Sequence, residues 1–580
     1  MANENKKSGL YPHLERINNP EDLKNMPAQE LDSLADEIRS FLIARVTENG
    51  GHLASSLGMV EATLAIHRVF SSPKDHIIFD VGHQSYTHKL ITGRREEFAS
   101  LRRGGGISGF PKRSESEHDA FGTGHSSTSV SAALGFSEAD RLSGSDAYTV
   151  CVFGDGAFTG GMIHEALNNC RKDLNLIMIL NENDPSVSQN IEGLISSFDN
   201  IAYFGPIDGN NVHAVEALLA SVKVSGKTSL VHIRTQKGKG YAPAEEQPDR
   251  YHCLTPRGTV HPDGRSFSEE MGTHLAELAQ NDTKICAITA AMTSGTGLSA
   301  FQKAHPERFF DVGIAEPHAV TFAAGLAANG YRPVVAIYSS FLQRAYDNII
   351  HDVALQNLPV VFCIDRAGLN SADGPTHHGI FDVSFLSQIP NISVYTPITN
   401  DSLCSIMDEA LALSTPVAIR YPNGYEDAAI KEAFYSPNAT VSGRARADYS
   451  LNDKTELDAV IITHGRIVIE AAKAKEALKA QGKNAGIILL EQLKPYDKIA
   501  AEVADLLPKH SCRILFLEEE MKAGGMGMNL SAALNGFEVM QNKSTSIRAL
   551  DNHFAMQTQD ESILKTAQLD CDAIVHDILF

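Results

Sequence analysis

Two polar residues in the first third of the chain are placed so that they can bind one divalent cation. Asp155 lies in the string GDG at 154–156, directly after the apolar run 148–153, and Asn183 comes shortly after the next apolar run, 174–180. A strand–helix–strand crossover makes its two strands parallel, so we expect both residues at the carboxyl edge of one sheet. Their oxygens suit Mg²⁺, which takes few protein ligands and completes its octahedron with phosphate and water.

A GDG string answered by an Asn after the next strand is typical of a thiamine diphosphate site, although GDG alone occurs in many turns. This cofactor also needs a carboxylate on its aminopyrimidine ring, usually from a different domain. Glu316 is the candidate, because it ends the apolar run 309–315 and precedes a predicted helix over 319–328. Without the GDG string, the usual interpretation of an acid after a strand is a charged residue in the first turn of the following helix. The GDG string favours the cofactor role.

Short apolar runs alternate with helix-length amphipathic segments, which indicates parallel sheets covered on both faces. The length of 580 residues exceeds the about 250–300 that one core reaches. We predict three doubly wound α/β domains, at 1–265, 266–435 and 436–580. The predicted strands are 76–80, 148–153, 174–180, 229–234, 284–289, 309–315, 332–338, 358–364, 417–421, 458–463, 485–490, 513–517 and 546–550. The polar stretches 242–263 and 425–457 are predicted linkers, and the charged segment 112–119 is predicted to be solvated.

The composition excludes several classes of protein. A net charge of -21 argues against nucleic acid as a partner, which would require a basic face. The eight cysteines include no CxxC pair, which favours a reducing compartment over a disulfide framework or a zinc site. No signal peptide and no membrane span are recognised. We therefore expect a cytoplasmic enzyme that acts on small molecules.

Several longer strings resemble the 1-deoxy-D-xylulose-5-phosphate synthase family, thiamine enzymes related to transketolase. They are GGHLASSLG at 50–58, DVGHQSYTHK at 80–89, FGTGHSSTS at 121–129, DVGIAEPHAVTFAAGLA at 311–327, AIYSSFLQRAYD at 336–347 and DRAGLNSADGPTHHG at 365–379. The resemblance implies condensation of pyruvate with glyceraldehyde 3-phosphate, with release of CO₂, for isoprenoid, thiamine and pyridoxal phosphate synthesis. It also implies a thiamine diphosphate-binding fold in the first two domains, a transketolase C-terminal-like third domain that serves mainly assembly, and a homodimer.

The resemblance also implies roles for individual residues. The implied cofactor contacts are His83, Gly124, His125, Ser126, Gly156, Ala157, Asn183, Tyr241, Glu316 and Phe341. The implied Mg²⁺ ligands are Asp155, Asn183 and the carbonyl of Pro185. The implied catalytic residues are Glu316, His52, His83, His377 and Asp373, since neutral imidazoles near pH 7 can move protons. The implied substrate contacts are Tyr338, Arg344 and Arg366, whose guanidinium suits a phosphate.

Four departures from the family pattern bear on the acceptor. Pro317 follows Glu316 where the family has Gln, and Pro185 stands in place of Met. Asn423 occupies the place of a second phosphate-binding Arg, and the segment 191–205 is shorter than the family's loop. Two alternatives stay open. In the first alternative, the chain is a paralogue that passes the same pyruvate-derived fragment to a different acceptor. In the second, it is a non-catalytic protein that binds the cofactor.

Overall fold

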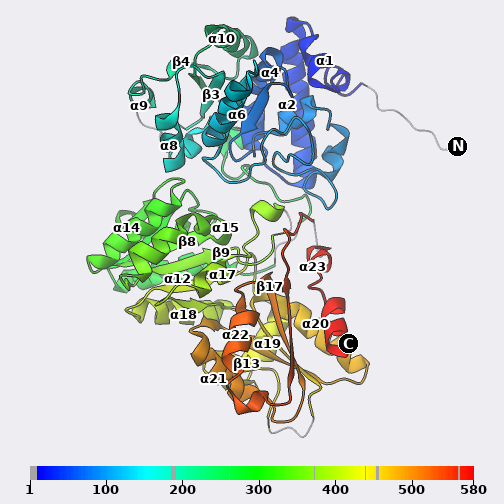
Figure 1. Ribbon diagram of the computed structural model, residues 1–580, viewed down its shortest axis with the longest axis vertical. Helices are drawn as coiled ribbons and strands as arrows, with labels where there is room; N and C mark the ends of the chain where they lie inside the picture. Colours follow the sequence, from blue (N-terminus) through cyan, green and yellow to red (C-terminus); the bar gives the residue numbers. More distant parts are fainter. Residues whose placement is uncertain are drawn as a thin grey trace, which may run out of the picture. The chain divides into compact units, whose positions relative to one another are not determined.

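The computed structural model describes residues 9–184, 191–259, 262–370, 373–437, 439–451, 456–558 and 562–580. The chain forms two compact units, Met1–His261 and Pro262–Phe580. The first contains one β-sheet and the second contains two, each accompanied by helices (Figure 1). The predicted α/β class is therefore confirmed. The division into three domains at residues 265 and 435 stays a prediction.

The sheet of the first unit is parallel, with the strand order β1-β2-β3-β5-β4. Its strands are β1 (His76–Phe79), β2 (Thr149–Gly154), β3 (Leu176–Glu182), β4 (Ala202–Asp208) and β5 (Ser229–Arg234). Four of them were predicted to within two residues at each end. The fifth, β4, was not, because it is an edge strand whose partly exposed residues include Pro206, and such a strand lacks the continuous apolar pattern.

Helices cover both faces of this sheet because successive strand residues point to opposite sides. Val150 and Val152 pack in one apolar cluster with helices α2 (Leu31–Asn49) and α4 (Val60–Val69). The intervening residues of β2 pack in a second cluster on the other face. That cluster includes residues of α6 (Ser129–Ser143) and α8 (Gly161–Asn169). The sheet is therefore buried on both faces, and its polar residues gather at the strand ends.

The second unit begins with a seven-stranded sheet of order β16-β10-β11-β9-β8-β6-β7. Its strands are β6 (Ile285–Thr289), β7 (Phe309–Asp311), β8 (Arg332–Tyr338), β9 (Val361–Asp365), β10 (Ser393–Tyr395), β11 (Val417–Arg420) and β16 (Gln492–Lys494). All neighbours pair in parallel except β10 and β16. The three-residue strands β10 and β16 were not predicted, because each is too short to show a periodic pattern.

The other sheet of this unit has six strands in the order β12-β13-β15-β14-β17-β18. They are β12 (Thr440–Ser442), β13 (Ala445–Ala447), β14 (Ala459–His464), β15 (Ala485–Leu490), β17 (Arg513–Met521) and β18 (Ser544–Leu550). The first two strands and helix α19 (Ala428–Tyr435) lie in the stretch predicted as the second linker, so this stretch contains regular structure, and its role as a linker stays a prediction. Strand β16 follows β15 in the chain yet pairs with the seven-stranded sheet, so the two sheets are joined within one unit.

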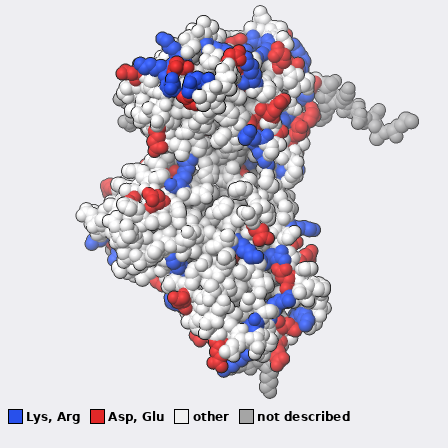
Figure 2. Space-filling model, in the orientation of Figure 1, with Lys and Arg blue, Asp and Glu red and all other residues white. Residues whose placement is uncertain are grey.

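The surface and the helices bear on the expected partners. Basic and acidic side chains are intermixed on the face shown in Figure 2. Among the described helices, none combines the length and the apolar character that a membrane crossing requires. The charged segment 112–119 is only partly solvated, because Asp119 is 2% exposed and its carboxylate accepts hydrogen bonds from Arg94 at 2.8 and 2.9 Å.

Candidate active site

The predicted pair of polar residues meets at the carboxyl edge of the first sheet. Strand β2 ends at Gly154, and Asp155 begins the short helix α7 (Asp155–Phe158). One carboxylate oxygen of Asp155 accepts hydrogen bonds from the backbone N–H groups of Asn183 and Asp184, both at 2.8 Å. The other oxygen accepts from the N–H of Gly156 at 2.8 Å. The two strand ends are thereby connected through one carboxylate, as the crossover geometry predicted.

This carboxylate has capacity left for a cation. A carboxylate offers about four lone-pair sites, and three N–H groups occupy three of them. The side-chain oxygen of Asn183 is a second ligand of the kind that Mg²⁺ prefers. Pro185, the third predicted ligand, lies outside the described residues. The donor set therefore fits a hard divalent cation.

A second loop at the same edge carries the predicted cofactor contacts 124–126. Asp80, which follows β1 and is 1% exposed, accepts hydrogen bonds from the N–H groups of Ser127 at 2.6 Å and Ser129 at 2.9 Å. The Ser127 hydroxyl donates to the carbonyl oxygen of Ala157 at 2.8 Å, which links this loop to the GDG turn. Sequence reasoning did not assign Asp80 a role, although an acid directly after a buried strand is a usable signal.

Two of the predicted catalytic histidines lie together in the first unit. The ring centroids of His52 and His83 are 5.8 Å apart. His252, which was not predicted, lies 5.8 Å from His52 and 5.1 Å from His83. Phe110 packs on His52 at 5.2 Å. His252 belongs to the first predicted linker and to no recognised string, so only the tertiary structure identifies it.

Two of these histidines, His83 and His252, are neutral at pH 7 because their surroundings lower the pKa of each ring. Burial lowers the pKa of His83 well below its usual value, and the neighbouring His252 and His52 lower it further. Burial, aided by the charge of Lys237, lowers the pKa of His252 to about 4. Among the described residues, the buried Nδ1 of His83 has no hydrogen-bond partner. An imidazole in this state can accept a proton from a bound molecule. Tyr241 packs on the ring of Tyr251 at 5.6 Å, one residue before His252.

Glu316 begins a helix of the second unit. Strand β7 ends at Asp311, four residues earlier than predicted, because the backbone turns at Gly313, whose φ is +71°. Helix α14 (Glu316–Ala328) accordingly begins three residues earlier than predicted. The side chain of Glu316 is almost fully buried, and its Oε2 lies 3.9 Å from Arg344 Nη1.

The carboxylate of Glu316 has an unused acceptor. No described residue donates a hydrogen bond to its buried Oε2. Burial raises the pKa of Glu316, while the charge of Arg344 acts in the opposite direction. A buried polar atom without a partner is costly, and a bound molecule with a matching donor removes that cost. Glu316 therefore fits a group that donates to it or shares a proton with it.

Other predicted residues of the second unit converge at the ends of β8 and β9. The rings of Tyr338 and Phe341 stack at 5.7 Å, and His377 contacts Phe341 at 5.4 Å. The guanidinium of Arg366 lies 3.8 Å above the ring of Tyr338. Arg366 also donates to the carbonyl oxygen of Gly295 at 2.9 Å, so it is anchored rather than being a mobile surface cation.

The contacts of His377 with its own loop concern the predicted role of Asp373. His377 Nδ1 lies 2.8 Å from the hydroxyl of Thr376, and that hydroxyl also lies 3.3 Å from the carbonyl oxygen of Asp373. Control of His377 by the carboxylate of Asp373 stays a prediction. Asn423 is exposed beyond strand β11.

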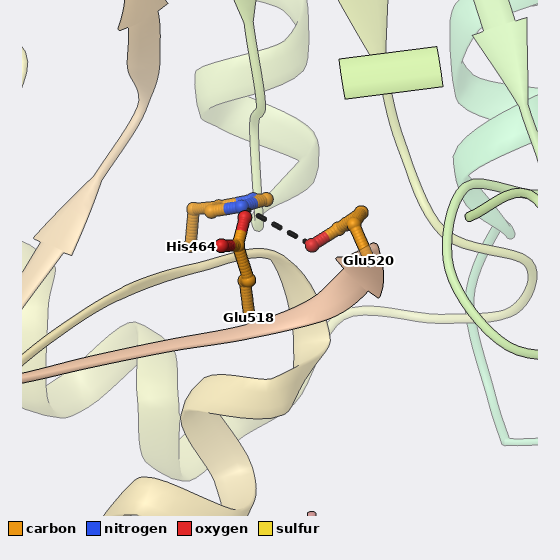
Figure 3. A group of neighbouring side chains, drawn as sticks. All are labelled: His464, Glu518 and Glu520. Carbon is orange, nitrogen blue, oxygen red and sulfur yellow. Dashed lines mark ion pairs between the residues drawn. The ribbon is translucent and has the colours of Figure 1, made fainter. Parts of the chain in front are cut away.

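A group of buried ionisable side chains in the six-stranded sheet was not predicted. His464, Glu518 and Glu520 bring their potential ligand atoms within 4.8 Å of one another (Figure 3). The Nδ1 of His464 lies 3.3 Å from Nη1 of Arg420, which can only donate, so the ring proton is on Nε2, 3.3 Å from Glu520 Oε2. Glu518 accepts two N–H groups at the start of α22 (Met526–Leu534). We interpret the group as an ion-pair network, because a protonated Nε2 has no lone pair for a metal.

Three sequence families match successive parts of the chain. Residues 14–202 match 1-deoxy-D-xylulose-5-phosphate synthase, 264–425 the transketolase pyrimidine binding domain, and 448–574 the transketolase C-terminal domain. Together with the three sheets, these matches define an enzyme of the transketolase type. Such an enzyme uses thiamine diphosphate.

Curated relatives identify the family more narrowly. The chain is 44% identical to 1-deoxy-D-xylulose-5-phosphate synthase of Carboxydothermus hydrogenoformans, over 89% of this chain and 91% of that protein. It is 42% identical to the synthase of Caldanaerobacter subterraneus subsp. tengcongensis, over 98% of both. Among solved structures, transketolase from Campylobacter jejuni subsp. jejuni NCTC 11168 matches 96% of this chain and 100% of that chain, at 17% identity and a TM-score of 0.45. The chain belongs to the 1-deoxy-D-xylulose-5-phosphate synthase family, which confirms the predicted resemblance.

Proposed function

We propose that this protein condenses pyruvate with glyceraldehyde 3-phosphate to form 1-deoxy-D-xylulose 5-phosphate and CO₂. The observation that carries the reaction is the 44% identity to a curated synthase over 89% of the chain. The buried, unpartnered oxygen of Glu316 supports the cofactor part of the proposal independently of any relative. The enzyme is a transferase of small carbon units.

Thiamine diphosphate, when bound, supplies the nucleophilic carbon and the electron sink that break the carbon–carbon bond of pyruvate. The protein's part on the diphosphate side is to hold a divalent cation with Asp155 and Asn183, and with the predicted carbonyl of Pro185. The three hydrogen bonds to Asp155 support this role, since they orient its carboxylate before any ligand binds. The loop residues 124–126, 156 and 157 are proposed to contact the cofactor beside it.

On the pyrimidine side, Glu316 is proposed to hold a proton between its Oε2 and a ring nitrogen. Its burial supports this role, because a raised pKa brings the carboxyl closer to sharing that proton. Phe341 and Tyr338 present an aromatic surface beside His377. We propose that this surface contacts the ring of the cofactor and excludes water from the reacting carbon.

Proton movements are assigned to the histidines. His52, His83 and the unpredicted His252 are proposed to donate and accept protons at the substrate carbonyl, and burial keeps His83 and His252 neutral at pH 7. Arg366 and Arg344 are proposed to bind the anionic groups of the substrates. Arg366 retains N–H donors beyond the one used by Gly295.

The reaction is tested by identifying products by mass spectrometry after supplying pyruvate with a panel of aldehydes, thiamine diphosphate and Mg²⁺. We expect 1-deoxy-D-xylulose 5-phosphate from glyceraldehyde 3-phosphate. A different main product would favour the paralogue with another acceptor, an alternative that the exposed Asn423 motivates. No CO₂ release from pyruvate would leave only a cofactor-binding protein.

We also propose that the chain forms a homodimer, with domains at 1–265, 266–435 and 436–580. The separate family matches over 14–202, 264–425 and 448–574 support the domain boundaries. Light scattering after size-exclusion chromatography gives the assembled mass, which we expect to be twice the chain's 62.8 kDa.

A further inference from the structure

The two described arms of the segment after strand β9, 366–370 and 373–379, carry three of the proposed site residues, Arg366, Asp373 and His377. The arms are joined by two hydrogen bonds of 2.8 Å, from Gly368 N–H to the Gly379 carbonyl and from Gly379 N–H to the Gly368 carbonyl. They extend from the seven-stranded sheet. Their remaining neighbours therefore decide how rigidly Arg366 and His377 are held.

The first of these neighbours belongs to the six-stranded sheet. Arg466, two residues after strand β14, donates a hydrogen bond through Nη2 to the carbonyl oxygen of Leu369. Its Nε lies 3.2 and 3.3 Å from the two carboxylate oxygens of Glu519 on β17. The side chain of Glu519 packs against Gly368 so closely that a Cβ atom there would collide with the carboxylate. The first arm is therefore held by an ion pair of the other sheet.

The second arm is held by the chain that follows β18. His378 Nδ1 accepts a hydrogen bond from the N–H of Asn370 at 2.9 Å. Its Nε2 must then carry the proton, and it donates to the carbonyl oxygen of Ala555 at 3.0 Å. Burial lowers the pKa of His378 to about 4, which keeps the ring neutral and able to accept and donate at once. Gly374 packs on the backbone and Cβ of Gln557.

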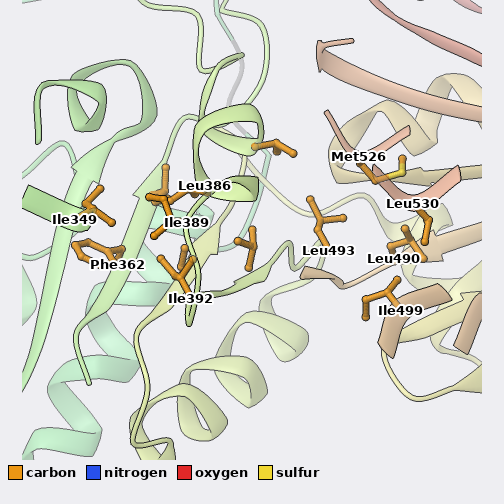
Figure 4. Close-up of a cluster of buried hydrophobic side chains, with 14 of the residues drawn as sticks. Ile349, Phe362, Leu386, Ile389, Ile392, Leu490, Leu493, Ile499, Met526 and Leu530 are labelled. Atoms are coloured by element: carbon orange, nitrogen blue, oxygen red, sulfur yellow. The ribbon is translucent and has the colours of Figure 1, made fainter. Parts of the chain in front are cut away.

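The base of this segment is fixed by the buried ion-pair network. Asp382, three residues after the second arm, lies 3.0 and 3.2 Å from Arg420, and Arg420 lies 2.6 Å from Glu520 of β17. One apolar cluster also includes buried side chains from both sheets of this unit. It includes Phe362 of β9 and Leu493 of β16 in the seven-stranded sheet, and Leu490 of β15 in the six-stranded sheet (Figure 4). The six-stranded sheet thus supports the first arm and the base of the segment, and the chain that follows its last strand supports the second arm.

We propose that Arg466 and Glu519 are positioning residues for the reaction. They hold the first arm, and with it Arg366, in its working geometry. Because the two arms are paired, they also hold His377 on the second arm. The inference rests on the proposed function and extends it, because it gives the six-stranded sheet a part in catalysis besides assembly. Neither residue is among the proposed substrate contacts. A displacement of about 1 Å in a group that contacts substrate costs up to about 100-fold in rate.

The test compares three variants of the full-length enzyme. Arg466→Met removes the guanidinium group and keeps an unbranched side chain that reaches about as far as arginine Nε. Arg466→Lys keeps a charge beside Glu519 but cannot also reach the Leu369 carbonyl with the same geometry. The control is Arg548→Met, which removes a comparable Arg–carboxylate pair, with Asp577, from the same sheet.

Two measurements are made on each variant. Hydrogen exchange on the protein without cofactor reports the mobility of peptides that cover 366–370 and 377–379. Steady-state kinetics with pyruvate and glyceraldehyde 3-phosphate reports kcat and KM separately. For Arg466→Met we expect faster exchange in both peptides and a fall of about 10–100-fold in kcat/KM. For Arg466→Lys we expect values of kcat/KM and of the exchange rate between those of Arg466→Met and the parent. For Arg548→Met we expect kcat/KM within about twofold of the parent, although its melting temperature falls as much as that of Arg466→Met.

The outcomes separate this inference from the proposed function. A parent enzyme that makes no 1-deoxy-D-xylulose 5-phosphate refutes the proposed function, while the exchange data still show whether Arg466 holds the arms. An active parent with unchanged exchange in Arg466→Met overturns the positioning role. Faster exchange with parental kcat/KM overturns it as well, because the contact then has no consequence for the reaction. Equal losses in Arg466→Met and Arg548→Met overturn it by showing a general effect of stability.

Discussion

The candidate residues of the two units are held in different ways. In the first unit the supports come from the same sheet: Asp80 after β1 holds the loop at 127–129, and Asp155 after β2 holds the chain after β3. In the second unit the segment with Arg366 and His377 is held largely by another sheet, through Arg466, Glu519 and the chain near Ala555. The candidate site in the first unit therefore depends on the strand order of one sheet. The candidate site in the second unit depends on how its two sheets pack against each other.

The two units also treat ionisable groups differently. In the first unit, His83 and His252 lie beside each other, and burial keeps both rings neutral. The charges of the second unit are paired, and Arg420 and His464 hold the pKa of Glu520 at about 2 against the opposing effect of burial. The first arrangement leaves groups able to take up protons. The second uses its charges to fix positions.

The largest expected effect comes from Glu316 of the second unit, whose buried Oε2 accepts no hydrogen bond from a described residue. Glu316→Gln keeps the shape but removes the acid, so we expect CO₂ release from pyruvate to fall by about 100-fold or more. The measurement is CO₂ release with Mg²⁺ and saturating thiamine diphosphate. The exposed Glu307, changed to Gln, serves as the control. Equal activity of parent and Glu316→Gln would leave this carboxylate without a catalytic role.

The next effect concerns the connected strand ends of the first unit. In Asp155→Asn an amide NH₂ replaces an oxygen that now accepts N–H groups, so both the turn and the cation ligand are lost. We expect thiamine diphosphate to bind at least about tenfold more weakly in calorimetric titrations with Mg²⁺. Asp173→Asn is the control, because its exposed side chain lies away from the strand ends. Unchanged affinity in Asp155→Asn would contradict the proposed metal site.

The pH dependence of stability tests the neutral histidines. The pKa of His252 is about 4 in the folded protein against an ordinary value of 6.5, so the unfolded chain binds the proton more readily. Its contribution is therefore complete above about pH 6.5 and is lost as the pH falls toward 4. We expect the free energy of unfolding in urea to fall less between pH 7 and pH 5 in His252→Asn than in the parent. Parallel losses in both proteins would show that His252 is not buried in its neutral form.

The smallest expected effect lies at Asn423. The residue is exposed, and an ion pair at an exposed position contributes about 0–1 kcal/mol. We expect Asn423→Arg to lower KM for glyceraldehyde 3-phosphate by no more than about fivefold, and to leave KM for unphosphorylated glyceraldehyde unchanged. Steady-state kinetics with both aldehydes gives the comparison. An equal change for the two would mean that this position does not sense the phosphate.

Most of the buried strands could be predicted from the sequence, because strands covered on both faces carry continuous apolar runs. The edge strands β4 and β12 and the three-residue strand β13 could not, since partly exposed or very short strands show no continuous apolar run. Strand β7 was predicted too long, because an apolar run does not show where Gly313 turns the chain. The same uncertainty placed the start of helix α14 at Ala319 instead of Glu316.

The sequence by itself determined the class of enzyme and the residues that follow the strands, because crossover geometry brings strand ends together. Asp155 and Asn183 were predicted in this way. Only the tertiary structure showed that His252 joins His52 and His83, that Asp80 holds the loop beside them, and that Arg466 and Glu519 hold the arm after Arg366. These contacts join segments far apart in the chain. Tertiary packing determines which of these segments come into contact, and no periodic pattern in a single sequence indicates such contacts.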